Sequence, residues 1–214
     1  MKIIGINGSP RKGWNTHILI EQALKGAVQG GAQTELVNLY DLHFTGCISC
    51  FTCKRQDSTG LGHCAVKDDL KPLLEKVEAA DGIVIGSPIY WGEVTASTRA
   101  FLERFLFQYL TYSKEQNSLL KKRIKTVFIF TGNVPEDHLE PMGYRAKFDD
   151  YKRLFDRFIG ELQLFISTET LQVDDYAKYG MTMFDEAARK ERRKEVFPLD
   201  CKRAFEAGDA LARI

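Results

Sequence analysis

The stretch MKIIGINGSPRKGWNT, residues 1–16, decides the expected fold of this chain. It begins with Ile3, Ile4 and Ile6, a short β-branched run that is typical of a strand buried on both faces. Turn-forming residues 7–10 end this strand, Asn15 and Thr16 are candidate N-caps, and apolar residues with i,i+4 spacing follow them. The sequence therefore predicts a strand, a short polar loop and a helix in immediate succession.

A loop between a buried strand and a helix is a candidate anion site. Backbone N–H groups without a helical partner and the positive end of the helix dipole both point at such a loop. Arg11 and Lys12 would add positive charge there, and Ser9 and Thr16 would add hydroxyl donors. The pattern indicates a phosphate-binding loop; the alternative is an ordinary polar turn between a strand and a helix.

The loop lacks the two best-known nucleotide-binding motifs. Two glycines have the spacing of a Walker loop, but Trp14 and Asn15 replace the lysine and the hydroxyl residue that this motif requires. The dinucleotide fingerprint is absent as well, because Ser9 interrupts its glycine spacing. A single terminal phosphate is therefore the ligand that this loop suits.

Composition limits the class of protein. The 214 residues, of which 44% are hydrophobic and 28% charged, fit one globular α/β domain over residues 1–214. A net charge of +1 gives no preference for nucleic acid or for a membrane surface. No apolar run approaches transmembrane length, and a strand starting at Lys2 leaves no room for a targeting peptide. A cytoplasmic location is therefore expected.

Strand-like and helix-like patterns alternate along the rest of the chain. Five strand–helix units predict a parallel sheet with helices on both faces, and ligands bind such sheets beyond the carboxyl ends of the strands. The loops expected to meet there are 7–16, 87–93 and 131–134. The further strands are expected at 34–39, 82–86, 124–130 and 164–173.

Three other segments complete the expected organisation. A long connection, residues 40–67, holds four of the five cysteines. A helical stripe of apolar residues runs from Tyr151 to Leu162. The tail, residues 184–214, is expected to be helical, with its basic run 189–194 exposed to solvent.

The sequence SPIYWG, residues 87–92, follows the most apolar expected strand. Its proline ends the strand, and its final glycine lets the backbone approach a ligand closely. Between them, Ile89, Tyr90 and Trp91 offer flat apolar surface. A phosphate site and a site for a planar ring together describe a flavin mononucleotide (FMN). The alternative is that these aromatic residues only pack on the core or on another subunit.

The sequences GSPRKGWNT, residues 8–16, and SPIYWG together resemble the flavodoxin-like NADPH-dependent FMN reductase family. With its cysteines, the chain looks closest to the iron–sulfur flavoproteins of that group. The resemblance covers about residues 1–132. It implies a flavodoxin-like three-layer sandwich with a five-stranded parallel sheet in the order 2-1-3-4-5, and homodimers or homotetramers with the flavin ring near a subunit contact.

The same resemblance implies FMN as cofactor, NAD(P)H as electron donor, and a set of contacts to FMN. Those contacts are Ser9, Arg11, Asn15 and Thr16 at the phosphate, Pro88, Ile89, Tyr90, Trp91 and Gly92 along the ring, and Thr131 and Gly132 on its far side.

Cys47, Cys50 and Cys53 follow one another with two-residue gaps, a spacing that lets three thiolates reach three corners of a [4Fe-4S] cluster. Cys64 would be the fourth ligand, although ten residues separate it from Cys53, more than in the compact motif of iron–sulfur flavoproteins. The alternatives are a zinc site, a disulfide, or free thiols that hold no metal.

These observations predict an FMN-dependent oxidoreductase that takes electrons from NAD(P)H and passes them to a flavin, a quinone or another small acceptor. No arrangement of side chains for acid–base or nucleophilic catalysis is evident, which fits chemistry done by a cofactor. With a cluster, the function would become electron transfer between a ferredoxin-like donor and an acceptor. A flavodoxin-type electron carrier, which the nearly neutral charge disfavours, and a metal-binding regulatory protein are the competing hypotheses from different functional classes.

Overall fold

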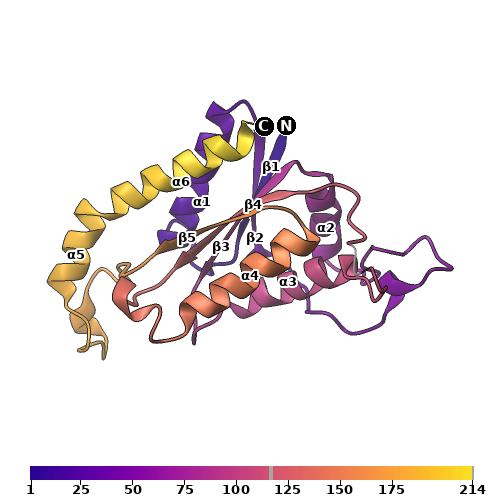
Figure 1. Cartoon of the computed structure of the whole chain (residues 1–214). Helices are drawn as coiled ribbons and strands as arrows, with labels where there is room; N and C mark the ends of the chain where they lie inside the picture. The colour runs from indigo at the N-terminus through magenta and orange to yellow at the C-terminus, as the bar shows by residue number, and fades with distance from the viewer. Residues whose placement is uncertain (116–117, 214) are drawn as a thin grey trace.

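The computed structural model describes residues 1–115 and 118–213. Its centre is one sheet of five parallel strands in the order β2-β1-β3-β4-β5, which confirms the expected flavodoxin-like topology (Figure 1). The strands are β1 (Lys2–Asn7), β2 (Gln33–Asn38), β3 (Gly82–Pro88), β4 (Lys125–Thr131) and β5 (Leu162–Ser167).

Helices cover both faces of the sheet, and this gives the expected three layers (Figure 1). One face packs against α1 (Asn15–Gln29) and α6 (Phe197–Ala212). The other face packs against α2 (Leu70–Ala79), α3 (Ala96–Tyr109) and α4 (Tyr144–Phe158). The remaining helix is α5 (Glu186–Glu195), and the short 3-10 helices are η1 (Leu39–Asp41), η2 (Thr52–Lys54), η3 (Glu136–His138) and η4 (Tyr176–Lys178).

The central strands are apolar because both of their faces are buried. In β1, Ile3 contributes to the core under α1 and α6, whereas Ile4 and Ile6 contribute to the core on the other face. In β3, Val84 and Ile85 divide between the two cores in the same way, and both are fully buried. The short β-branched runs of the sequence are therefore explained by burial on both faces.

Two elements end more than two residues away from the expected position. The helix expected to extend to Leu162 ends at Phe158, and β5 spans Leu162–Ser167 instead of residues 164–173. The cause is a tight turn at Gly160, where an added Cβ would lie 2.3 Å from the carbonyl oxygen of Ile124. Apolar periodicity continues across this turn, so the pattern alone did not reveal it.

No helix within the described part of the chain has the length and apolar character needed to cross a membrane.

Helices α1 and α6 pack with their backbones in close approach. An added Cβ on Gly208 would lie 1.7 Å from the carbonyl oxygen of Ala23, and one on Gly26 would lie 1.9 Å from that of Phe205. Real Cβ atoms do not approach backbone atoms this closely, so both positions require glycine. This close approach joins α6 to α1, and both helices lie on the same face of the sheet.

Gly208→Ala is expected to destabilise the protein by about 3 kcal/mol, because the steric cost of overpacking exceeds the gain of about 1 kcal/mol in helix propensity. Urea unfolding followed by circular dichroism measures the change. Gly180→Ala is the control, since no heavy atom lies within 4 Å of a Cβ added there. A Gly208→Ala variant as stable as wild type would contradict the close packing of these helices.

Candidate functional site

A cavity of about 240 Å³ lies where the carboxyl ends of the strands meet. The loops after β1, β3 and β4 meet there as expected, and the segment after β5 joins them. The lining residues are Ser9, Arg11, Trp14, Asn15, Thr16, Pro88, Ile89, Tyr90, Thr131, Gly132, Asn133, Thr170, Gln172, Val173 and Met181.

The β1–α1 loop is fixed to the end of β3 by backbone contacts. The N–H of Gly8 donates to the carbonyl oxygen of Gly86 at 2.8 Å, and the hydroxyl of Thr95 donates to the carbonyl oxygen of Gly8 at 2.7 Å. An added Cβ on Gly8 would lie 1.8 Å from the Thr98 hydroxyl oxygen, so glycine is required at this position. Ser9 follows, buried, and its hydroxyl accepts the N–H of Arg11 at 3.1 Å.

The N-terminus of α1 faces this cavity without a side-chain cap. Asn15 and Thr16 were candidate N-caps, but the cap is Trp14, and its side chain makes no capping hydrogen bond. The first-turn N–H groups of α1 are therefore available to an anion. The Thr16 hydroxyl lies 2.7 Å from that of Thr131, which ties the helix start to the end of β4.

Side chains of the β1–α1 loop also bind the segment after β5. The Asn15 amide donates to the carbonyl oxygen of Leu171 at 2.7 Å, and Trp14 Nε1 donates to the same oxygen at 3.2 Å. Arg11 stacks on Trp14 with its guanidinium carbon 4.1 Å from the ring centroid, and it donates to the carbonyl oxygen of Gln172. The segment after β5 thereby closes one side of the cavity.

Lys12 is the one predicted phosphate ligand that lies outside the cavity lining. Its ammonium group pairs with Asp41 at 2.7 Å, and both side chains are exposed. The other four predicted residues of this loop line the cavity together.

The β3–α3 loop contributes a tight turn to the site. Trp91 and Gly92 adopt left-handed backbone conformations with φ of 52° and 75°, and Tyr90 and Glu93 pair across them. The N–H groups of Ile89 and Tyr90 are already bonded, to the carbonyl oxygens of Thr131 and Glu93, both at 2.8 Å. Among the described residues no partner exists for the N–H groups of Trp91 and Gly92, which leaves two adjacent donors.

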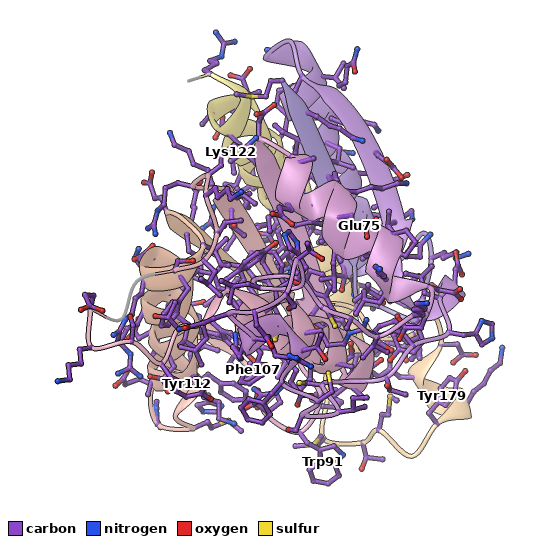
Figure 2. All side chains as sticks on the ribbon, turned by 90° about the vertical axis from the view of Figure 1, so that its right-hand side faces the viewer. Glu75, Trp91, Phe107, Tyr112, Lys122 and Tyr179 are labelled. Carbon is purple, nitrogen blue, oxygen red and sulfur yellow. The ribbon has the colours of Figure 1, made fainter. Side chains whose placement is uncertain are left out.

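The predicted ring contacts separate into two groups. Pro88, Ile89 and Tyr90 line the cavity, whereas Trp91 and Gly92 are not part of its lining. The Trp91 side chain is fully exposed and projects from the edge of the molecule (Figure 2). On the opposite wall, Gly132 donates its N–H to the carbonyl oxygen of Ser167 at 3.1 Å.

Sequence reasoning missed the contribution of the C-terminal part. The basic run 189–194 was expected to be exposed, but Arg189 is buried against Asn133 and Glu169, and Arg193 donates to the Asn15 side-chain oxygen at 2.7 Å. Residues 170–173 were expected to belong to the strand 164–173, but they lie in a loop after β5. The one sequence feature that pointed to this region was the position of Asn133, directly after the predicted contacts Thr131 and Gly132.

The four crowded cysteines line a second, small cavity against α3. Cys47, Cys50, Cys53 and Cys64 share it with Arg104, Phe107 and Gln108. The ten-residue gap before Cys64 forms a closed loop, because the N–H of Gly62 donates to the carbonyl oxygen of Cys53 at 2.9 Å. The structure therefore brings together all four cysteines that the sequence grouped.

The thiols of this cavity have different environments. The N–H and hydroxyl of Thr52 hold the pKa of the exposed Cys50 thiol below its usual value. Burial raises the pKa of the Cys53 thiol. None of the five cysteines forms a disulfide. Over residues 1–115 and 118–213, no three His, Cys, Asp or Glu side chains are grouped closely enough to ligate one metal ion.

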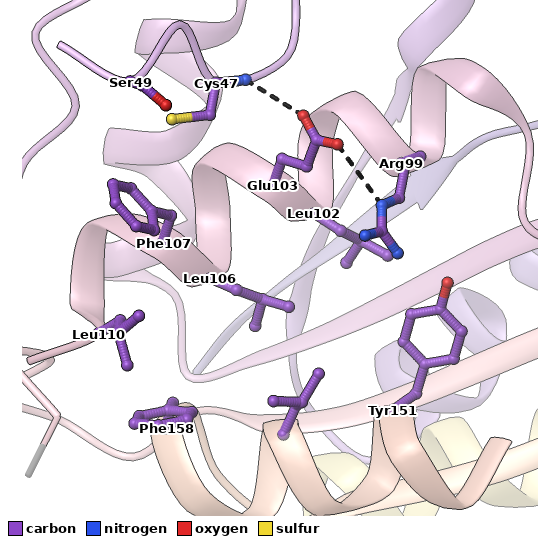
Figure 3. A pocket seen from close by; sticks show the side chains of 11 residues that line it. Cys47, Ser49, Arg99, Leu102, Glu103, Leu106, Phe107, Leu110, Tyr151 and Phe158 are labelled. Atoms are coloured by element: carbon purple, nitrogen blue, oxygen red, sulfur yellow. Dashed lines mark hydrogen bonds and ion pairs between the residues drawn. The ribbon is translucent and has the colours of Figure 1, made fainter. Parts of the chain in front are cut away.

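A third cavity, of about 490 Å³, is an apolar groove between α3 and α4 (Figure 3). Cys47 and Glu103 lie at its rim, where the Cys47 N–H donates to the Glu103 carboxylate at 3.3 Å. The apolar residues that line it are Leu102, Leu106, Phe107, Leu110, Leu154 and Phe158.

The parallel sheet, its strand order and the polar cavity at its carboxyl edge define a flavodoxin-like α/β protein. A family profile described as NADPH-dependent FMN reductase matches residues 1–133. The chain therefore belongs to the NADPH-dependent FMN reductase family, and this membership supports the use of FMN and NAD(P)H.

Curated relatives are named iron–sulfur flavoproteins. One from Methanocaldococcus jannaschii is 40% identical over 104 residues, which are 49% of this chain and 51% of the relative. Another from Methanosarcina thermophila is 35% identical over 124 residues, 58% of this chain and 60% of the relative. The chain thus spans about half to three-fifths of the length of these relatives.

A solved structure supports the fold over the full chain. The NAD(P)H:quinone oxidoreductase from Methanothermobacter marburgensis has a TM-score of 0.72 at 19% identity, covering 99% of this chain and 98% of that protein. At this identity the likeness establishes the fold alone.

Proposed function

We propose that this protein binds FMN in the cavity at the carboxyl edge of the sheet and transfers electrons from NAD(P)H to a small acceptor, such as a flavin or a quinone. The observation that carries the proposal is the pairing of an uncapped helix N-terminus with an apolar loop in one cavity. Bound FMN would supply the hydride and electron transfer, for which the protein has no side chain.

The phosphate end of the site is built from α1 and the loop before it. First-turn N–H groups, the Ser9 and Thr16 hydroxyls and the Arg11 guanidinium are donors, and donors fit a phosphate. The Asn15 side-chain N–H donates to the Leu171 carbonyl oxygen, and its side-chain oxygen accepts from Arg193. Because both groups are already bonded, we propose that Asn15 holds the segment after β5 beside the phosphate and does not bind the phosphate itself. Lys12 would act at most through its charge.

The ring end of the site is built from the β3–α3 loop. Ile89 and Pro88 give an apolar wall, and Thr131 and Gly132 face them across the cavity. The N–H groups of Trp91 and Gly92, which have no partner within the described chain, are suited to bond ring oxygen or nitrogen atoms. Such donors would stabilise the negative charge that the ring gains on reduction.

A second candidate function is electron transfer through an iron–sulfur cluster between a ferredoxin-like donor and an acceptor. It is favoured by the four cysteines that line one cavity and by the names of the relatives. The donor set fits a [4Fe-4S] cluster, in which each thiolate binds a different iron. Gln108 also lines this cavity, and its buried side-chain nitrogen has no hydrogen-bond partner in the described structure. A cluster sulfur would supply an acceptor.

We further propose that the protein forms a homodimer or homotetramer through the apolar groove between α3 and α4. The groove presents leucine and phenylalanine side chains from two adjacent helices (Figure 3). A second copy of this chain would remove this surface from water, and burial of apolar area is the main favourable term in association. The flavin-binding loop after β3 leads directly into α3, so the ring would lie near this contact.

The protein reconstituted with FMN is expected to oxidise NADPH or NADH for many turnovers when a quinone is present. An anaerobic assay of absorbance at the nicotinamide band measures this. A flavodoxin-type carrier would show almost no turnover with the same flavin content, and that result would reject the enzymatic proposal. Failure to bind FMN at all would reject the site as well.

Arg11→Ala is expected to weaken FMN binding about tenfold, because it removes a charge-assisted donor to the phosphate. Riboflavin, which has no phosphate, should bind wild type and variant equally. Fluorescence titration with both flavins measures the two affinities. Lys25→Ala, an exposed position on α1, is the control. An equal loss for both flavins would mean that Arg11 acts only through its contacts with Trp14 and Gln172.

Leu106→Glu is expected to convert the oligomer to a monomer, since it places a charge in the apolar groove. Light scattering coupled to size-exclusion chromatography measures the mass. Leu199→Glu, at an exposed leucine of α6, should leave the mass of the oligomer unchanged. A monomeric wild type, or an oligomeric Leu106→Glu variant, would contradict this interface.

A further inference from the structure

The fourth cysteine of the group is held by α3 at both its backbone and its sulfur. The N–H of Cys64 donates to the Gln108 side-chain oxygen at 3.0 Å. The Cys64 sulfur accepts the Nε–H of Arg104 at 3.3 Å. These two contacts come from one helix face, one turn apart, and fix Cys64 independently of the ten-residue loop that precedes it.

Arg104 is fully buried, which is unusual for an arginine. Its other N–H groups donate to the Asp68 carboxylate and to the carbonyl oxygens of Thr45 and Val66, the latter two at 3.3 Å. Thr45 precedes the first cysteine of the group, and Val66 and Asp68 follow the last. One guanidinium therefore joins both ends of the cysteine-rich loop and also contacts a cysteine sulfur.

The guanidinium geometry is necessary for this arrangement. Arginine offers five N–H donors in a planar fork, so it can bond two carbonyl oxygens, a carboxylate and a sulfur at once. Lysine carries the same charge, but its three donors converge on one nitrogen at the end of a flexible chain. It could pair with Asp68, but it could not hold the other partners in the same geometry.

We propose that Arg104 is a positioning residue for an iron–sulfur cluster: it fixes Cys64 as the fourth ligand and donates an N–H to the ligating sulfur. This inference rests on the cluster of the second candidate function. Donors to a ligating sulfur stabilise the added negative charge when one electron enters a cluster, so they raise its reduction potential. The role of Arg104 therefore includes setting the potential, besides holding the loop.

The first test is Arg104→Lys in the full chain, reconstituted anaerobically with FMN, iron and sulfide. We expect unchanged FMN content, a lower midpoint potential of the cluster than in wild type, and a fraction of three-iron clusters that reports a released Cys64. Iron and sulfide assays and a potential titration followed by electron paramagnetic resonance measure these. Arg153→Lys, which also alters an arginine paired with an aspartate but lies on the surface of α4, is the control.

A second measurement can overturn the proposal with the wild-type protein alone. Wild-type protein labelled with ¹⁵N only in arginine should show a weak nitrogen coupling to the reduced cluster in pulsed electron paramagnetic resonance. Arg104 is the sole arginine lining the cysteine cavity within the described chain. The coupling should persist in Arg153→Lys and vanish in Arg104→Lys.

The outcomes separate the two hypotheses. If wild type takes up no iron and sulfide while binding FMN, the cluster is rejected, and with it the role of Arg104. If wild type holds a cluster but shows no arginine coupling, or if Arg104→Lys has the potential, spectrum and iron content of wild type, only the role of Arg104 is overturned.

Discussion

The hydrogen bond between the Gly8 N–H and the Gly86 carbonyl oxygen is the contact on which the cavity at the carboxyl edge of the sheet depends. It joins the ends of β1 and β3, and the Thr95 hydroxyl secures the same glycine from the start of α3. Both polar backbone groups of Gly8 are thereby bonded, and the Thr98 hydroxyl leaves no room for a side chain. The distance from the uncapped N-terminus of α1 to the loop after β3 is set by this contact. A ligand with a phosphate at one end and a ring at the other requires such a fixed distance.

Helix α3 supports two cavities, which explains its unusual share of buried polar residues. Thr98 in its first turn packs against Gly8 of the β1–α1 loop, whereas Arg104 and Gln108 hold the cysteine-rich loop further along. At a rise of 1.5 Å per residue, Thr98 and Arg104 are separated by about 9 Å along the helix. Buried polar groups cost free energy unless they are bonded, and here each bond goes to a loop that carries a proposed cofactor. The polar residues of α3 thus couple the positions of two loops far apart in sequence.

Periodicity and turn chemistry predicted the parallel sheet and three of the four loops of the cavity, because those signals are local, whereas the strand order was implied by the family resemblance. The contacts that complete both sites are not local. Cys64 and Arg104 are forty positions apart in the sequence, and this spacing does not predict a contact between them. Asn15 had the character of a helix cap and phosphate ligand, yet Leu171 and Arg193 engage its amide and oxygen. A sequence pattern shows what a side chain can bond, and the tertiary fold decides which partner it meets.

The gap before Cys64 does not by itself decide whether this cysteine can serve as a fourth ligand. A wide gap argues against a metal site only if a longer loop makes closure much more costly. Each doubling of loop length costs only about 0.6 kcal/mol in closure free energy. Two sets of hydrogen bonds offset a cost of that size: the Gly62 N–H donates to the Cys53 carbonyl oxygen, and the Lys54 ammonium donates to carbonyl oxygens at the C-terminus of α3. What a fourth ligand requires is a rigid anchor close to its own position. Gln108 and Arg104 provide that anchor from outside the loop, so the number of residues inside the loop matters little.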